Sequence, residues 1–139
     1  RPDNPEAHFD LAQALEIKAD GLQEPERTQG LRQAISTYLE VVRLDASHHR
    51  AHYNVGLVHH KLKSWAAEIA AYGEALKLQP GYTAAMYNLA FALRDKGDIA
   101  GAKTAFMKYL RASEQDKGEA RFRVVAQREL AKLSGGGQP

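Results

Sequence analysis

A repeat of 34 residues constrains this chain more than any other feature of its sequence. When the chain is shifted by that length, the segment 51–76 lies over the segment 85–110 without a gap. The matching positions are Tyr53 with Tyr87, Asn54 with Asn88, Val55 with Leu89, Gly56 with Ala90, Trp65 with Ile99, Tyr72 with Phe106 and Leu76 with Leu110. Residues that recur in register at such a period indicate a repeat architecture, in which each unit is one supersecondary element.

An earlier segment carries the same pattern with an interruption. Residues 5–16 match the first half of the unit, but the second half, residues 31–45, aligns only when an insertion of about ten residues near 20–29 is allowed. The matches in the first half are His8, Leu11, Ala12 and Leu15, which fall on His52, Val55, Gly56 and His59. We therefore expect three repeats, at residues 5–48, 49–82 and 83–116.

Each repeat is predicted to form two amphipathic helices joined by a tight turn, so the chain is expected to be all-α. Its apolar residues recur three and four positions apart, which is the spacing of one helix face. In the third repeat, Gly97 is expected to end one helix and Asp98 to cap the next. Small residues mark the places where helices must approach closely: Ala12, Gly56, Ala90, Ala34 and Ala102.

The segment KGDIAGAKT at residues 96–104 has a superficial likeness to a phosphate-binding loop. That motif needs a glycine directly before its lysine and a strand leading into it. Ala102 occupies the glycine position, and the residues before the segment have helical spacing. We therefore interpret the segment as a helix end, a helix start and a helix contact, and we expect no nucleotide or other cofactor.

The recurring positions resemble the tetratricopeptide repeat (TPR) family over about residues 2–116, including the KGD…A…F second helix and the segment ALKLQP. The resemblance implies a right-handed superhelix of three TPR helix-turn-helix repeats plus a C-terminal capping helix. The departures from the family pattern are His8, His52 and Met86 at a position that is often Trp, Glu68 and Tyr109 at positions for small residues, and Ala46 and Glu114 at the closing proline.

The two ends of the chain carry separate expectations. Residues 1–4 look like the tail of an upstream repeat in a longer protein, and residues 134–139 look like a flexible tail. Residues 117–133 are expected to form the capping helix, because the last repeat of a solenoid exposes apolar surface that must be covered. The apolar face of this helix is expected to consist of Phe122, Val125, Ala126, Leu130 and Leu133.

The resemblance also implies that the first helix of each repeat lines a concave groove, which in this family usually holds an extended peptide or a helix of a partner protein. The expected lining residues are Phe9, Gln13, Arg50, Tyr53, Asn54, Leu57, His60, Lys61, Tyr87, Asn88, Phe91 and Arg94, with Asp10, Glu16 and Asp95 beside them.

Aromatic side chains share one position in this predicted groove. Phe9, Tyr53 and Tyr87 are expected to form a ladder of exposed rings, because they occupy equivalent places in the three repeats. Rigid rings gain contact area at little entropic cost, and Asn54 and Asn88 could bond a ligand's backbone. The alternative is that these residues are part of the family's framework and bind nothing.

Charged residues bear on the kind of ligand. TPR domains that clamp a terminal carboxylate use Lys and Arg at groove positions that here hold Phe9, Gln13, Ala84 and Asn88, and only Asn54 matches. We therefore expect no carboxylate clamp. Basic residues elsewhere in the groove, namely Arg50, Lys61 and Arg94, could still favour an acidic segment.

Five histidines lie between residues 48 and 60 and raise the question of a metal site. His52 and His59 are about two helical turns apart, roughly 10 Å, which is too far to share one zinc ion. We expect both to pack between helices, and we expect no metal site. Since a buried neutral histidine resists protonation, stability is expected to fall as the pH drops through about 6.

The distribution of charge limits the classes of partner. Net charges are −4 for residues 1–48, +3 for 49–116 and +3 for 117–139, a mild gradient that differs from the basic footprint of a nucleic-acid-binding protein. No apolar run is long enough to insert across a membrane. The compartment stays undetermined, with the cytoplasm slightly favoured: no signal-like stretch is present, but the chain looks like an excised domain.

These observations predict a scaffold for protein–protein interaction with no catalytic activity of its own. The chain has no nucleophile elbow and no metalloprotease spacing. Two alternatives stay open. The chain could be an accessory or targeting domain of a larger enzyme or secretion machine, or a module for homo-oligomerisation.

Overall fold

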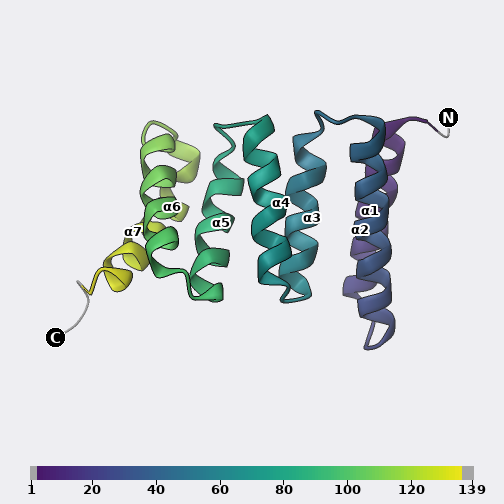
Figure 1. The fold of residues 1–139 in the computed structure, drawn as a ribbon, viewed down its shortest axis with the longest axis horizontal. Helices are drawn as coiled ribbons and strands as arrows, with labels where there is room; N and C mark the ends of the chain where they lie inside the picture. The colour runs from purple at the N-terminus through teal and green to yellow at the C-terminus, as the bar shows by residue number, and fades with distance from the viewer. Residues whose placement is uncertain (1–2, 136–139) are drawn as a thin grey trace. The chain divides into compact units, whose positions relative to one another are not determined.

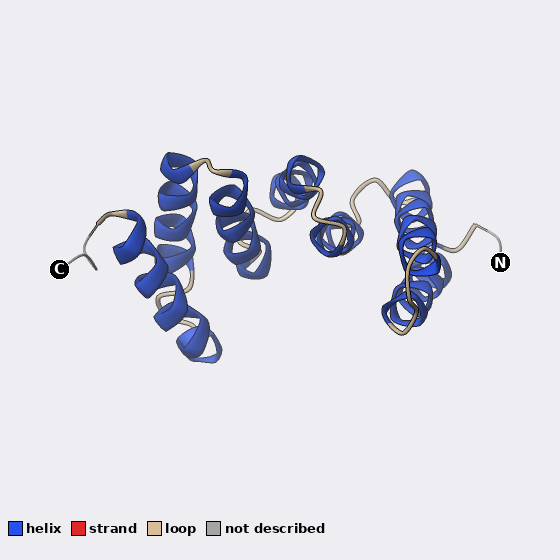
Figure 2. Ribbon diagram, turned by 90° about the horizontal axis from the view of Figure 1, so that it is seen from below, coloured by secondary structure: helices blue, strands red, loops and turns tan. Residues whose placement is uncertain are grey.

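The computed structural model describes residues 3–135 of the chain, and these residues form helices joined by short turns with no strand (Figures 1 and 2). The elements are α1 (Pro5–Asp20), α2 (Glu26–Leu44), α3 (His49–Lys61), α4 (Trp65–Leu78), α5 (Thr83–Lys96), α6 (Ile99–Ala112), the 3-10 turn η1 (Lys117–Glu119) and α7 (Ala120–Leu133). They divide into two compact units, Arg1–Gln79 and Pro80–Pro139. The all-α class predicted from the sequence is confirmed.

The first unit contains two helical hairpins, α1–α2 and α3–α4, with α2 packed against α3. Its core includes Leu31, Tyr38, Val41 and Val58, all with no exposed surface. The small residues predicted at close helix contacts are buried, among them Ala12 and Ala34. Their size lets neighbouring helices approach closely enough for the larger side chains to interdigitate.

The first hairpin is longer than the second. Helices α1 and α2 have 16 and 19 residues, whereas α3 and α4 have 13 and 14. The extra residues near 20–29 thus lengthen both helices, and residues 21–25 form the turn between them. The hairpin extends as a continuous antiparallel pair, because Gly30 of α2 meets the Cβ of Ala19 closely.

Helix α5 ends and helix α6 begins at the residues that the sequence predicted. Gly97 ends α5 in the left-handed conformation, with φ of 98°, and the Asp98 carboxylate accepts a hydrogen bond of 2.9 Å from the Gly101 N–H at the start of α6. These caps satisfy backbone groups that have no partner inside a helix. Ala102 is fully buried, which confirms its role as a helix contact in place of a phosphate loop.

The second unit contains the α5–α6 hairpin with α7 packed on α6. Ala126 of α7 is buried in a core with Phe106 and Tyr109, while η1 precedes the helix at residues 117–119. Phe122 was expected on the buried face of this helix, but it is 43% exposed. Phe122 meets the Tyr87 ring edge-on, at 5.4 Å between ring centroids, and much of its own ring stays open to solvent.

The tails predicted at residues 1–4 and 134–139 lie mostly outside the described residues, which include only their inner ends. Within residues 3–135, no helix combines the length and the apolar character that crossing a bilayer would require.

Candidate partner-binding surface

The first helices of the two repeats in the first unit present one shared surface, which we call the α1/α3 surface. Side chains from both helices meet on it: Lys61 of α3 contacts Glu16 of α1, and Arg50 of α3 lies over Phe9 of α1. We use this name for the following residues, none of which is fully buried: Gln13, Glu16 and Asp20 of α1, and Arg50, Tyr53, Asn54, Leu57, His60 and Lys61 of α3.

Phe9 does not belong to the accessible part of this surface, contrary to the predicted ladder of exposed rings. Only 2% of Phe9 is exposed. Its ring stacks on His48, with 5.0 Å between centroids, and meets Tyr38 edge-on at 5.6 Å. The Arg50 guanidinium covers it at 4.7 Å from the ring centroid. Phe9 therefore supports the surface from beneath, and Arg50 is the exposed group above it.

A chain of polar contacts fixes α1, α2 and α3 to one another under this surface. The Asn54 amide donates to the Tyr38 hydroxyl at 3.3 Å, and that hydroxyl donates to the Glu16 carboxylate at 2.9 Å. Burial, followed by the charge of Glu16, raises the pKa of Tyr38, so the hydroxyl stays protonated. Asn54 was predicted to hydrogen-bond the backbone of a ligand. In the structure, its amide group already donates one hydrogen bond within the protein, to Tyr38.

Lys61 is bound by two carboxylates of α1. Its Nζ lies 2.7 Å from an oxygen of Glu16 and 2.7 Å from an oxygen of Asp20. Burial acts to lower the pKa of Lys61, but the bonds to Asp20 and Glu16 outweigh it and the pKa is raised. The ammonium is therefore a charged internal link between α1 and α3.

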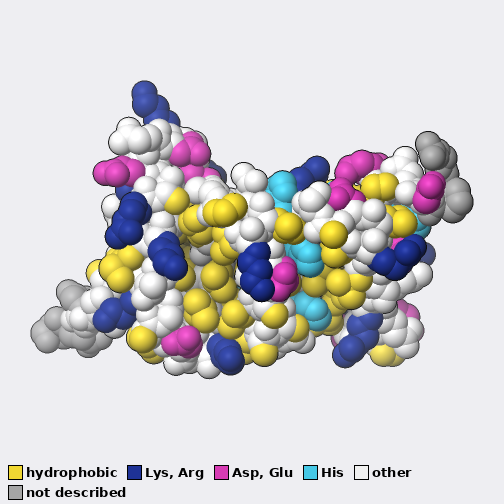
Figure 3. Space-filling model, turned by 45° about the horizontal axis from the view of Figure 1, so that its top comes forward, with side chains coloured by type: hydrophobic (Ala, Val, Ile, Leu, Met, Phe, Trp, Pro, Cys, Tyr) yellow, Lys and Arg dark blue, Asp and Glu magenta, His cyan; other side chains and the backbone are white. Residues whose placement is uncertain are grey.

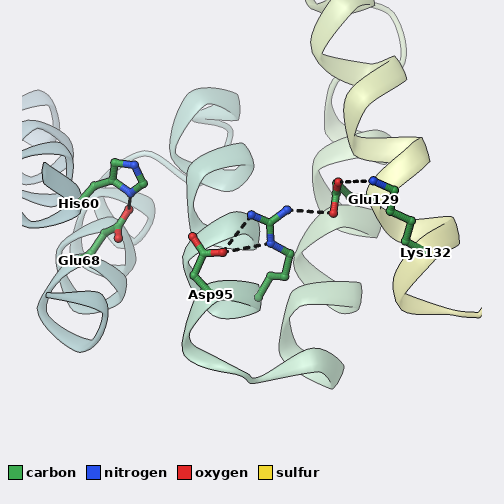
Figure 4. A network of polar contacts seen from close by, with 6 residues as sticks. His60, Glu68, Asp95, Glu129 and Lys132 are labelled. Carbon is green, nitrogen blue, oxygen red and sulfur yellow. Dashed lines mark hydrogen bonds and ion pairs between the residues drawn. The ribbon is translucent and has the colours of Figure 1, made fainter. Parts of the chain in front are cut away.

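His60 is the most exposed aromatic residue of the surface, and a buried carboxylate holds its ring. The His60 side chain is 55% exposed, and its Nδ1 lies 3.2 Å from an oxygen of Glu68, which is itself 1% exposed (Figure 4). The Tyr72 hydroxyl donates to the same Glu68 oxygen at 2.9 Å. From the sequence, Glu68 was noted only as a charged residue at a position that is small in the family pattern, and its pairing with His60 was not predicted. A charge at a helix-packing position, eight residues after a histidine, was the signal that could have revealed the pair.

Tyr53 and Leu57 are half-buried and lie on α3 between Arg50 and His60. The Tyr53 ring packs at a tilt against Tyr72, with 5.8 Å between centroids. The Tyr53 ring is thus held by Tyr72, and Tyr53 and Leu57 together give the α1/α3 surface a partly open apolar centre.

In the second unit, the predicted aromatic residues belong to a packed cluster. Tyr87 lies 4.9 Å from Phe91, 5.2 Å from Tyr109 and 5.4 Å from Phe122 between ring centroids, and Phe91 meets Phe106 edge-on at 5.0 Å. Burial raises the pKa of the Tyr87 hydroxyl. Tyr87, Phe91 and the neighbouring Asn88 are half-buried, so only part of each side chain faces outward.

Arg94 of the same unit joins α5 to α7. Its guanidinium lies 4.8 Å from the centroid of the Phe91 ring. It makes ion pairs of 2.9 Å with Asp95 and with Glu129, both labelled in Figure 4. Glu129 also pairs with Lys132 at 3.4 Å. Burial acts to lower the pKa of Arg94, but the hydrogen bonds to Asp95 and Glu129 outweigh it and the pKa is raised.

The histidines do not form a metal site in the part of the chain that the structure describes. Among residues 3–135, no group of three or more His, Asp or Glu side chains is arranged to hold a metal ion. Burial lowers the pKa of both His52 and His59, which favours their neutral forms. Figure 3 shows histidines lying among apolar side chains on one face of the molecule.

With the fold and this geometry established, comparison with known families identifies the class of protein. A sequence profile described as tetratricopeptide repeat matches residues 26–83, and a second profile with the same description matches residues 83–116. Together they cover well over half of the chain. The chain belongs to the tetratricopeptide repeat family.

Solved structures share the fold of this chain. The type III secretion translocator chaperone SycD of Yersinia enterocolitica superposes with a TM-score of 0.80 at 13% identity, over 100% of this chain and 89% of that one. The same chaperone in complex with a peptide of the translocator YopD gives 0.75 at 13% identity, over 93% and 96%. A thermophilic TPR protein of Thermus thermophilus gives 0.79 at 22% identity, over 94% and 66%. No curated protein sequence matches this chain significantly.

Proposed function

We propose that this chain is a protein-interaction module that binds an extended or helical segment of a partner protein on the α1/α3 surface. The observation that carries the proposal is the partly open apolar centre formed by Tyr53 and Leu57, with His60 beside it. Aromatic side chains that are fixed before binding lose little entropy when a partner arrives. The structure of SycD with a peptide of YopD supports this use of the fold.

The arrangement around His60 supports a module without catalytic activity. A histidine paired with a carboxylate is one part of many acid–base sites, but the third group here, the Tyr72 hydroxyl, is fully buried and already donates to Glu68. A substrate could not reach that hydroxyl. We therefore assign the pair to the positioning of the His60 ring.

The experiment is a peptide-display selection on the full chain, run in parallel on wild type and on Tyr53→Ala/Leu57→Ala. Leu11→Ala/Leu39→Ala is the matched control, because Leu11 and Leu39 are exposed apolar residues of α1 and α2 outside the α1/α3 surface. Circular dichroism and melting curves establish that all three proteins are folded. We expect a common motif on wild type and on the control, and its loss on the Tyr53/Leu57 variant.

Two other results would contradict the proposal, one in its location and the other as a whole. A motif that survives the Tyr53/Leu57 variant would remove the α1/α3 surface as the binding site. Selection of no motif on wild type would contradict the proposal of a peptide-binding module altogether.

Self-association is the second candidate function. It rests on the exposed apolar side chains of the first unit, Leu11, Ile17 and Leu39, which are 51%, 73% and 49% exposed. A second copy of the chain could cover them. Sedimentation analysis over a hundredfold range of protein concentration tests this. A constant monomer mass would contradict it, whereas a mass that rises in wild type but not in Leu11→Ser/Leu39→Ser would support it.

A further inference from the structure

One buried tyrosine supports both the apolar centre of the α1/α3 surface and the histidine beside it. The ring of Tyr72, which is fully buried, packs against Tyr53 with 5.8 Å between centroids. Its hydroxyl donates at 2.9 Å to Oε2 of Glu68, and the same oxygen lies 3.2 Å from Nδ1 of His60. Tyr53 and His60 are therefore both supported, directly or through Glu68, by Tyr72 of α4.

His60 lies on the same face of α3 as the apolar centre. Leu57 follows Tyr53 by four positions and His60 follows Leu57 by three, which is the spacing of side chains along one face of a helix. The His60 side chain is 55% exposed, whereas Tyr53 and Leu57 are half-buried. A partner segment that covers the apolar centre along α3 therefore also reaches His60.

Two side chains of α4 contact the His60 ring and orient it. The Trp65 ring lies 6.1 Å from it between centroids, and Glu68 faces its Nδ1. Figure 4 shows the other ring nitrogen, Nε2, on the side of the ring away from Glu68. One nitrogen of this exposed ring is thus turned toward a buried carboxylate, and the other is turned away from it.

The carboxylate bears on which nitrogen of the neutral ring carries the proton. Its Oε2 accepts from the Tyr72 hydroxyl, whose pKa is raised by burial and then by the charge of Glu68, so that hydroxyl stays protonated. A lone pair on Nδ1 of His60 would face this negative oxygen at 3.2 Å and be repelled, whereas an N–H is attracted. A neutral imidazole has one donor nitrogen and one acceptor nitrogen. The arrangement therefore favours a proton on Nδ1, which leaves Nε2 as an acceptor.

Helix packing alone does not require this pair of polar groups. In the third repeat, the positions of Glu68 and Tyr72 are occupied by Ala102 and Phe106, and both are fully buried in the core of their unit. That repeat thus packs with neither the carboxylate nor the hydroxyl. Removing a carboxylate from water carries a penalty, so a residue with 1% exposure at this position destabilises the fold unless its contacts compensate. The surface group that Glu68 contacts is His60.

We infer that His60 determines specificity on the α1/α3 surface: Glu68 positions its ring so that Nε2 accepts a hydrogen bond from a donor of the partner segment, next to the segment's apolar residue on Tyr53. This inference rests on the proposed function. The donor is a backbone N–H or a side-chain N–H or O–H, and the carboxylate behind the ring makes Nε2 a stronger acceptor. Loss of one such hydrogen bond is expected to weaken binding about two- to tenfold.

The first measurement identifies the tautomer of His60 in the full chain without any partner. Long-range proton–nitrogen correlation NMR at about pH 8, where imidazole is neutral, distinguishes a ring nitrogen that carries a proton from one that does not. We expect the proton on Nδ1 in wild type and in Tyr72→Phe, which keeps Glu68. In Glu68→Ala/Tyr72→Phe, which reproduces the pair of the third repeat, the preference for Nδ1 should be lost.

The second measurement is the affinity of the best wild-type peptide from the display selection described above. Tyr72→Phe should bind it as wild type does, whereas His60→Leu and Glu68→Ala/Tyr72→Phe should each weaken binding about two- to tenfold. His60→Gln should recover part of the loss, because its amide oxygen is also an acceptor.

Variants of the same peptide identify the donor. Alanine replaces each side chain in turn, and an α-hydroxy acid replaces each residue in turn to remove its backbone N–H. One replacement is expected to weaken binding to wild type and to have no further effect on His60→Leu, since the coupled groups then share one interaction. The kind of replacement shows whether the donor is a side chain or the backbone.

The outcomes separate this inference from the proposed function. A wild-type ring with its proton on Nε2, or a peptide that binds His60→Leu as tightly as wild type, would overturn the inference and leave the proposed function standing. Selection of no peptide on wild type would overturn both. If Glu68→Ala/Tyr72→Phe melts early, the His60 variants still decide, because they change an exposed side chain.

Discussion

Gly56 and Tyr72 lie so close together that the glycine has no room for a side chain. A Cβ placed on Gly56 would lie 2.3 Å from Cε1 and 2.6 Å from Cδ1 of Tyr72. The Tyr72 ring is fully buried between α3 and α4, and its hydroxyl is held by Glu68. The ring therefore cannot move aside cheaply, and the spacing of these two helices depends on the missing methyl group.

We predict that Gly56→Ala destabilises the protein, although alanine is the better helix former. Overpacking of a core costs about 1–3 kcal/mol, which exceeds the gain of about 1 kcal/mol in helix propensity. Gly73→Ala in α4 is the control, since a Cβ there meets nothing within 4 Å. Urea unfolding should show a loss for Gly56→Ala and a gain of about 0.5–1 kcal/mol for Gly73→Ala. Equal effects at the two sites would show that the contact with Tyr72 is relaxed in solution.

His48 is predicted to stabilise the start of α3. Its Nδ1 accepts a hydrogen bond of 3.1 Å from the Ala51 N–H, so Nε2 carries the proton and donates to Glu6 at 2.9 Å. We expect His48→Ala to lose about 1–2 kcal/mol through loss of the cap. His48→Asn should recover part of that loss, because asparagine is a good cap. The measurement is the urea midpoint, and a His48→Asn variant no more stable than His48→Ala would show that stacking on Phe9 is the dominant contribution.

The fold was predictable because its signals are local. Helical spacing, Gly97 and Asp98 act within a few residues of one another, and the structure places a helix end and a helix start there. The repeat period of 34 residues also predicted that the helices form pairs, because residues that recur in register occupy equivalent positions in successive units.

The surface could be predicted only in part, because its details depend on contacts between distant residues. Lys61 contacts Glu16, which lies 45 residues earlier in the sequence. The sequence of α3 alone therefore suggested that the Lys61 charge was available to bind a ligand. Phe9 occupies the same repeat position as Tyr53, yet Phe9 is buried, because Arg50 and His48 cover it. The period assigns equivalent positions but does not determine which side chains a neighbouring helix will cover.

Stability is predicted to fall as the pH drops from about 8 towards 5.5. Burial lowers the pKa of His52 and His59 below the ordinary value of 6.5. Between 6.5 and the lower folded value, the unfolded chain binds more protons than the folded chain, so acidification favours unfolding. Below the folded value the contribution is constant. The tyrosines with raised pKa values titrate only at alkaline pH, outside this window.

Melting temperatures of wild type and of His52→Leu/His59→Leu across this pH range test that prediction. The wild-type melting temperature should fall more steeply than that of the variant, which has lost both titrating groups. Parallel curves for the two proteins would assign the pH dependence to other groups.

Glu68 and Tyr72 are predicted to depend on each other energetically. Glu68→Ala restores the small residue usual in the family but leaves the buried Tyr72 hydroxyl without its acceptor, which should cost about 1–3 kcal/mol. Tyr72→Phe removes the donor and should cost about 1 kcal/mol or less. In Glu68→Ala/Tyr72→Phe both polar groups are gone, so the double variant should be more stable than the sum of the single losses predicts. Urea unfolding of the four proteins gives the coupling energy directly. Additive losses would show that the hydroxyl finds another partner when Glu68 is removed, and that the buried carboxylate serves His60 instead.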